Sequence, residues 1–346
     1  MRIFKRKLYD KLLEWKNNRH GKTAVLIEGA RRVGKSTLTK QFAENEYESY
    51  VMIDFSIVRD DVLELFNHID DLDYFFLQLQ FRLGVSLKER KSLVIFDEVQ
   101  KCPKARQAIK HLVADGRYDY IETGSLISIK KNVKDILIPS EEEKLFLYPM
   151  DYEEFKWALG DNTAIPQLRM LFDKKLSIGD AVTRKLMRDF RIYMVVGGMP
   201  QAVDTYIDTN NLMEVDRVKR NIIQLYEDDF YKIDSSGRLS MLFDAIPAQL
   251  NSNASRYQVA SAIGNNTDSE KVLQLISELR ESMTINMAYH ANDPNVGMSL
   301  AMDLNKYKMY IGDTGLFITL AFKDKDFTEN IIYQKCVRIV SKLRNV

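Results

Sequence analysis

The sequence of 346 residues is poor in the features that mark secreted, metal-binding or membrane-spanning proteins. Its two cysteines, Cys102 and Cys336, cannot build a disulfide framework and fit a reducing compartment. Its four histidines are scattered without the spacing of metal ligands, which argues against a zinc site. No run of about 18 apolar residues is present, and the basic start lacks the apolar core of a signal peptide. We therefore expect a cytoplasmic protein with no membrane partner.

Net charge is lacking as well, because 50 lysines and arginines are balanced by 49 aspartates and glutamates. The formal charge of +1 gives no overall attraction to nucleic acid or anionic lipid, so such binding needs a local basic patch. Hydrophobic residues at 45% and charged residues at 29% are ordinary for a folded protein and exclude wholesale disorder. The length allows two or three domains, each with its own core.

One strong motif is present in the stretch TAVLIEGARRVGKSTLTKQ, residues 23–41. Gly29, Gly34, Lys35 and Ser36 occupy every fixed position of G-x-x-x-x-G-K-[ST], between an apolar run and a helical pattern. The glycines let backbone amides turn inward around phosphates, and the helix start attracts the anion. This context makes a chance match the weaker alternative. We predict a Walker A phosphate-binding loop whose contacts come from Gly29, Ala30, Arg31, Arg32, Val33, Gly34, Lys35, Ser36 and Thr37.

The polar residues of this loop have different expected tasks. Lys35 is expected to reach the β- and γ-phosphates as a catalytic group, and the Ser36 hydroxyl to bind Mg²⁺. Arg31 and Arg32 either touch phosphate or stay solvated, and solvation is the favoured alternative for loop arginines.

A second motif, SLVIFDE at residues 92–98, is a buried strand that ends in two carboxylates. We expect Asp97 to hold Mg²⁺ together with Ser36, and Glu98 to orient and deprotonate the attacking water. Carboxylates at strand ends also cap helices, but the preceding phosphate loop favours the Walker B interpretation.

A further strand at residues 118–122 runs into Thr123-Gly124-Ser125. A small hydroxyl at this position suits a sensor of the γ-phosphate, so Ser125 or Thr123 is the candidate, with a helix cap as the alternative. No arginine finger can be assigned. Arg106, Arg117 and Arg191 all stay open, acting in cis or from a neighbouring subunit of a homo-oligomer.

Alternating strands and helices predict an α/β, P-loop NTPase three-layer sandwich with a five-stranded, mostly parallel sheet. The expected strands cover residues 24–27, 50–55, 92–98, 118–122 and 145–147. We expect helical segments at residues 3–17, 62–83 and 151–159, and an exposed loop over residues 130–144.

The second half of the sequence differs from the first in its predicted secondary structure. Residues 165–230 are mostly helical, broken at Gly197-Gly198-Met199-Pro200, and suit a lid. Short helices at 239–250, at 257–263 and from Thr267, then a hairpin within 283–302 and a strand at 308–312, predict a winged helix. Its third helix carries Asp268, Glu270, Glu278 and Glu281 against Lys271 and Arg280, and this acidic excess favours a protein-binding or structural role over DNA contact. The predicted domains are 1–160 (ATPase core), 161–235 (lid), 236–322 (winged helix) and 323–346 (tail).

The stretches GARRVGKST, IFDEVQKCP, the TGS turn, LYPMDYEEF, VGGMPQAV and KYKMYIGDTGL together resemble one family. It comprises prokaryotic AAA-type ATPases with an uncharacterised C-terminal region of winged-helix and restriction-endonuclease-like character. The resemblance implies an ATPase core that uses ATP, with Lys35, Ser36, Asp97 and Glu98 in their family roles and Ser125 as the sensor. It supplies no substrate.

The chain departs from that family near its end. Such proteins usually continue past IGDTGL into a domain resembling a metal-dependent nuclease, whereas the basic sequence from Cys336 onward looks unlike it. No strand-borne Glu-x-Lys is found, so we expect no nuclease activity and suspect a truncated or frame-shifted product.

The sequence thus predicts a Mg²⁺-dependent ATPase that uses hydrolysis as a switch or motor stroke on an unknown protein or DNA partner. The alternative is a nucleotide-dependent binding or regulatory module with little turnover, which docks protein or DNA through the winged helix.

Overall fold

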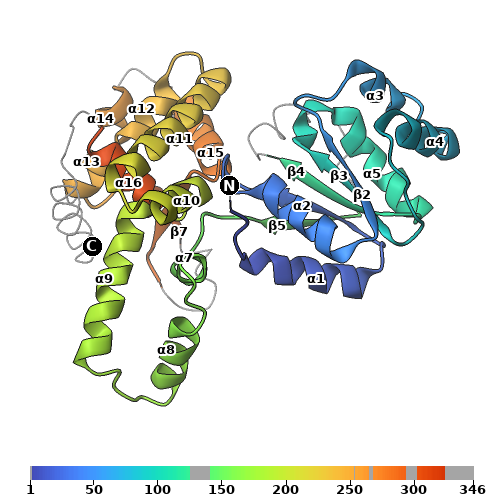
Figure 1. Ribbon diagram of the computed structural model, residues 1–346. Coiled ribbons are helices and arrows are strands. Elements are labelled where there is room, and N and C mark those ends of the chain that lie inside the picture. Colours follow the sequence, from blue (N-terminus) through green and yellow to red (C-terminus); the bar gives the residue numbers. More distant parts are fainter. Residues whose placement is uncertain (1, 125–140, 253, 265–267, 294–301, 324–346) are drawn as a thin grey trace. The chain divides into compact units, whose positions relative to one another are not determined.

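The computed structural model describes residues 2–124, 141–252, 254–264, 268–293 and 302–323 (Figure 1). The chain forms two compact units, one of residues 5–147 and one of residues 148–346 with residues 1–4. The compact units separate after Leu147, and the predicted four-part division stays a prediction. Cys336 and the rest of the predicted tail beyond residue 323 lie outside the described residues.

The first unit is built on a five-stranded parallel sheet with the order β2-β3-β4-β1-β5. The strands are β1 (Ala24–Glu28), β2 (Ser49–Asp54), β3 (Ser92–Asp97), β4 (Asp119–Gly124) and β5 (Glu142–Phe146). Every residue of β1, β3 and β4 is buried, as expected for central strands covered on both faces. The predicted α/β sandwich is therefore confirmed.

Helices cover both faces of this sheet (Figure 1). They are α1 (Lys7–Arg19), α2 (Lys35–Glu46), α3 (Asp60–Leu65), α4 (Leu72–Leu83) and α5 (Pro103–Asp115), with a short 3-10 turn, η1 (Val99–Lys101). Ala24 and Leu26 join an apolar cluster with residues of α3, α4 and α5, whereas the alternate side chains Val25 and Ile27 lie outside it. The alternation places α3–α5 on one face of the sheet and leaves the other to α1 and α2.

Three boundaries differ from the prediction. The fifth strand begins at Glu142, within the stretch predicted to be a loop, because this edge strand carries polar side chains and shows no apolar run. The helical region 62–83 is two helices, since Asp71 caps α4 by accepting a hydrogen bond from the backbone N–H of Tyr74. The first helix begins at Lys7, later than predicted.

The second unit is mainly helical, as predicted for residues 165–230. The first group of its helices is α7 (Tyr152–Ala158), α8 (Ala164–Asp173), α9 (Asp180–Val196), α10 (Pro200–Thr209) and α11 (Leu212–Ile233). The second group is α12 (Arg238–Asp244), α13 (Ile246–Asn251), α14 (Val259–Ile263), α15 (Ser269–Glu281) and α16 (Thr314–Ala321). The glycine-containing break falls between α9 and α10, where it was expected.

The predicted winged helix stays a prediction. Four short helices, α12–α15, precede an antiparallel pair of strands, β6 (Ile285–Ala291) and β7 (Met302–Ile311). The strand expected from Lys308 is the second half of β7, and the helix expected at 239–250 is divided into α12 and α13. Residues 294–301, at the centre of the expected hairpin, lie outside the described residues, as does Thr267.

A buried polar junction ties three segments of this unit together. The carboxylate of Asp313 accepts hydrogen bonds from the backbone N–H groups of Gly198, at 2.5 Å, and Leu316, at 2.8 Å. The carbonyl of Gly198 in turn accepts from the N–H of Met150 at 2.7 Å. Burial raises the pKa of Asp313, while the hydrogen bonds and the nearby Lys219 oppose that rise.

This junction yields a stability prediction for Gly198→Ala. A Cβ on Gly198 would lie 2.0 Å from the carbonyl oxygen of Met150, so backbone must move. We expect the free energy of unfolding of the unit to fall by about 3 kcal/mol, measured by chemical denaturation. Gln201→Ala, at an exposed position on α10, is the control and should change little. An unchanged midpoint for Gly198→Ala would show that the junction is loosely packed.

Candidate functional site

The phosphate-binding loop lies between the end of β1 and the start of α2 in the first unit. Gly34 has a φ of 97° as the residue preceding α2, a conformation that glycine adopts without strain. Gly29 is required for a different reason, because a Cβ there would lie 2.3 Å from the carbonyl oxygen of Leu147. The backbone at Leu147, directly after β5, therefore packs against the loop at Gly29.

Lys35 is the first residue of α2 and is buried beneath the loop. Its ammonium group donates to the carbonyl of Gly29 at 2.9 Å and to that of Ala30 at 3.0 Å. Burial lowers the pKa of Lys35, and the negative charges of Glu98 and Asp97 partly offset this effect. A positive group that is poorly solvated and close to a helix start is suited to hold an anion.

Asp97 joins the loop to the neighbouring strands. It is the last residue of β3, and its Oδ1 accepts hydrogen bonds from the hydroxyl of Ser36, at 2.9 Å, and from the hydroxyl of Thr123 on β4. A carboxylate and a hydroxyl at this spacing offer the hard oxygen ligands that Mg²⁺ prefers, so this pair fits the metal that the sequence implies.

Glu98 follows Asp97 in a strained backbone conformation, with φ 56° and ψ 44°. Such left-handed geometry is unusual for a residue other than glycine, and it is found most often at functional sites. The N–H of Glu98 donates to the Thr123 hydroxyl at 3.3 Å, and its carboxylate accepts from the amide of Gln100 at 2.5 Å. The site thus holds a carboxylate whose position is fixed by its neighbours.

The structure places only some of the residues predicted from sequence at the phosphate loop and the ends of β3 and β4. Ala30 and Val33 are buried within the loop and Thr37 is half-buried, whereas Arg31 and Arg32 are exposed. Thr123, one of the two sensor candidates, joins Asp97 and Glu98. Ser125 lies outside the described residues.

The three candidates for an arginine finger differ in their contacts. Arg106 is 1% exposed and pairs with Glu142 at 3.1 Å, so it cannot reach a neighbouring subunit. Arg117 pairs with Asp115 and with Asp73, each at 2.7 Å. Arg191 is exposed on α9 and stays a candidate.

Two contributors could not be found from the motif. Arg6 precedes α1 and is 5% exposed, and its guanidinium donates to the carbonyl of Val33 in the loop at 2.8 Å. Gln100 holds the Glu98 carboxylate as described above. Neither belongs to a spacing pattern, so only tertiary structure shows their proximity to the site.

A buried group of charges lies on the strands that carry the site. It contains Glu28 on β1, Glu122 on β4, Glu142 on β5 and Arg106 on α5. Burial raises the pKa of Glu28. It also raises that of Glu122 well above the usual glutamate range, with a further contribution from the negative charge of Glu142.

Glu122 should therefore lower stability at neutral pH. A carboxyl with a raised folded-state pKa keeps a proton that the unfolded chain releases, so stability falls as pH rises above about 4.5. We expect Glu122→Gln to be more stable than the parent at pH 8 by about 1–3 kcal/mol, with the difference vanishing near pH 4. Thermal unfolding over this range checks it, with the exposed Glu89→Gln as control. A Glu122→Gln protein less stable at pH 8 would contradict it.

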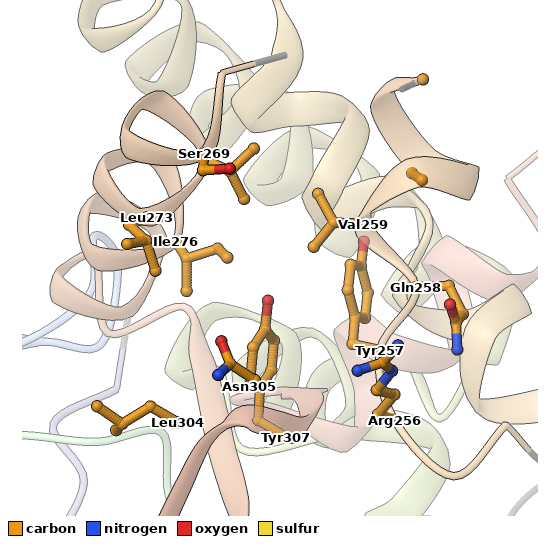
Figure 2. A pocket seen from close by; sticks show the side chains of 13 residues that line it. Arg256, Tyr257, Gln258, Val259, Ser269, Leu273, Ile276, Leu304, Asn305 and Tyr307 are labelled. Carbon is orange, nitrogen blue, oxygen red and sulfur yellow. The ribbon is translucent and has the colours of Figure 1, made fainter. Parts of the chain in front are cut away.

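The second unit contains a hollow of about 500 Å³ between α14, α15 and β7 (Figure 2). Val259 and Ile276 face each other across it, and the rings of Tyr257 and Tyr307 form part of its wall. Arg256 is the charged residue among the 13 described residues that line it. A largely apolar lining with one arginine gives little attraction for a phosphate backbone.

Comparison with protein families bears on the first unit. Residues 21–156 match the profile of a family described as an AAA domain. This part of the chain is therefore similar to an AAA domain. The matched region includes the phosphate loop, Asp97, Glu98 and Thr123, the residues that the geometry brings together. Residues 187–326 match a domain of unknown function, DUF8612. A search of curated proteins finds no match.

One solved structure supports the fold. The Walker-type ATPase PABY2304 of Pyrococcus abyssi aligns with 92% of this chain and 96% of its own length, with a TM-score of 0.55 and 16% identity. The ORC1 protein of Aeropyrum pernix, solved in complex with DNA, covers 99% of this chain and 95% of its own, with a TM-score of 0.34 and 10% identity. AMPPCP-bound DnaA from Aquifex aeolicus covers 80% and 88%, with a TM-score of 0.34 and 12% identity. The last two scores are too low to support an argument.

Within the described residues, no helix combines the length and the apolar character needed to cross a membrane.

Proposed function

We propose that this protein is a Mg²⁺-dependent ATPase whose hydrolysis drives a conformational switch or motor stroke on a macromolecular partner. The observation that carries the proposal is the hydrogen bond from Ser36 of the phosphate loop to Asp97 at the end of β3, at 2.9 Å. It joins the two motifs that a P-loop ATPase requires. The AAA profile over residues 21–156 supports ATP as the nucleotide.

The residues of the AAA domain have separable roles in this proposal. The loop amides and Lys35 bind the phosphates, and Glu98 orients and deprotonates the attacking water. Thr123 donates to the Asp97 carboxylate and accepts from the backbone N–H of Glu98, and it is the sensor candidate within the described residues. Ser36 and Asp97 would hold Mg²⁺, which neutralises charge on the phosphate oxygens when bound.

Phosphate release from ATP tests this proposal through the carboxylate at residue 97. We expect release by the wild type to require Mg²⁺ and to stop in EDTA, and Asp97→Asn to lose at least about tenfold in rate. Asp54→Asn is a matched control, because Asp54 is the register partner of Asp97 on the adjacent strand and caps the N–H of Ser56. Equal rates in EDTA, or in Asp97→Asn, would refute the assignment.

The second candidate function is a nucleotide-dependent binding module with little turnover, which docks a partner through the second unit. The lining of the hollow between α14, α15 and β7 is largely apolar with one arginine, which favours a protein over DNA as that partner. Duplex DNA should then leave ATP turnover unchanged, and its affinity should show no steep salt dependence. Stimulation by DNA with a steep salt dependence would reverse this preference.

The scarcity of cysteine in the sequence supports a reducing, cytoplasmic location for either function.

A further inference from the structure

One helix of the AAA domain presents an apolar stripe to solvent. Tyr74, Leu77 and Phe81 of α4 are 42%, 65% and 84% exposed. Their spacing of three, four and seven residues places them on one side of the helix, opposite the buried Phe75, Phe76 and Leu79. We call these three residues the α4 face. An apolar group of this kind on the surface of a soluble protein usually marks an interaction site.

The surroundings of the α4 face are acidic. Residues 57–83 contain six acidic side chains and two arginines, Arg59 and Arg82. Arg59 pairs with Asp61 at 3.0 Å, and Arg82 donates to the carbonyl of the same residue. The exposed Glu64 and Asp70 form no ion pair with any residue that the structure describes.

A second exposed apolar group lies in the other unit, on the helical hairpin made by α8 and the first half of α9. None of the residues 157–193 is buried, and Figure 1 shows the two helices projecting from their unit. The exposed side chains gather where the helices are joined: Met170, Phe172, Leu176 and Val182 are 50%, 81%, 57% and 48% exposed. We call these four residues the hairpin tip.

The surroundings of the hairpin tip are basic. Residues 164–193 contain seven lysines and arginines and three aspartates. Lys174, Lys175, Arg184 and Lys185 lie next to the tip, and all four are exposed. The formal charge of this hairpin is therefore +4, and that of residues 57–83 is −4.

We propose that the hairpin tip of one copy of this chain docks on the α4 face of a second copy. Each surface has an apolar centre, and the segments that carry them, residues 57–83 and 164–193, have formal charges of −4 and +4. Such complementarity steers association and selects the partner, while the apolar side chains supply most of the binding energy. A second copy is favoured over another protein because every copy carries both halves of the interface.

This geometry has a consequence for assembly. The two surfaces are different, so the contact is heterologous and each copy has one donor and one acceptor surface. Association then continues from copy to copy, giving a closed ring or an open chain of subunits. Because none of the loop residues takes part, the interface is independent of the proposed ATPase chemistry.

Sedimentation velocity of the full chain tests the proposal through two surface variants. The wild type should form concentration-dependent assemblies at low salt that weaken by at least about tenfold in 1 M NaCl. Phe81→Asp and Phe172→Asp each remove one surface, and each variant alone should be monomeric. Mixed in equal amounts they should form a heterodimer and nothing larger, because one intact surface remains on each. Met241→Asp, on an exposed apolar residue elsewhere, should assemble as the wild type does.

Several outcomes would overturn the proposal. A wild type that is monomeric at all concentrations would show that the surfaces have another occupant or meet within one chain. Assembly by Phe172→Asp alone would indicate a symmetric contact through α4. Failure of the two variants to pair, with both folded by circular dichroism, would show that the surfaces do not bind each other. If the wild type assembles as expected but does not hydrolyse ATP, that result would count against the proposed function and not against this interface.

Discussion

The substitution Glu98→Gln should lower the rate of ATP hydrolysis by about 100-fold or more while leaving ATP affinity within about twofold. Glutamine keeps the size of the side chain and can still contact Gln100, which lies 2.5 Å from the carboxylate. It cannot accept a proton from the attacking water. The loss should therefore fall on the chemical step, and binding, which depends on the loop and Lys35, should persist.

Turnover number and nucleotide affinity are measured separately to check this expectation. The control is Glu89→Gln, an exposed glutamate in the same domain, which should behave as the wild type. If Glu98→Gln hydrolysed ATP at the normal rate, Glu98 would not be the base, and its strained φ of 56° would need another explanation.

The substitution Lys35→Met should weaken ATP binding by about 2 kcal/mol or more, which is at least about 30-fold in Kd. Lys35 is 6% exposed beneath the loop, where a positive charge has little water to compete with a phosphate. Methionine matches the length of the side chain but removes the charge and the hydrogen bonds. The effect should be largest for nucleotides with a γ-phosphate.

Titration calorimetry with a non-hydrolysable ATP analogue measures the effect. Lys40→Met is the matched control, because Lys40 lies on the same helix with its side chain 56% exposed. Equal affinities for Lys35→Met and the wild type would mean that nucleotide does not occupy this loop.

The central part of the site could be predicted from sequence because its geometry is local. Gly29 to Ser36 form one continuous stretch, a loop with glycines at both ends that leads directly into the first residues of α2. The positions of Asp97 and Thr123 could also be predicted, since parallel strands bring their carboxyl ends to one edge of the sheet.

Other parts could not be predicted because they depend on packing between distant segments. Arg6 reaches Val33 across 27 residues of sequence, in a region that shows only an amphipathic pattern. The strand β5 pairs with β1 through backbone hydrogen bonds, so its polar side chains gave no periodic signal at Glu142. Glu122 resembles an ordinary strand residue until the neighbouring Glu142 is seen.

The division of the helical stretch 239–250 into α12 and α13 has a local cause that the pattern concealed. Pro247 lies in the first turn of α13, where its missing N–H is tolerated, and the chain restarts a helix there. The spacing of apolar residues shows no interruption at this point, so it did not indicate two helices.

Single-turnover hydrolysis, with the protein in excess over Mg²⁺-ATP so that every nucleotide is bound, shows whether this protein is an ATPase in its own right. We expect the wild type to convert bound ATP to ADP and phosphate, and Glu98→Gln to retain it intact over the same time. Recovery of intact ATP from the wild-type complex would contradict the account, and would identify the protein as a nucleotide-binding module that does not hydrolyse ATP by itself.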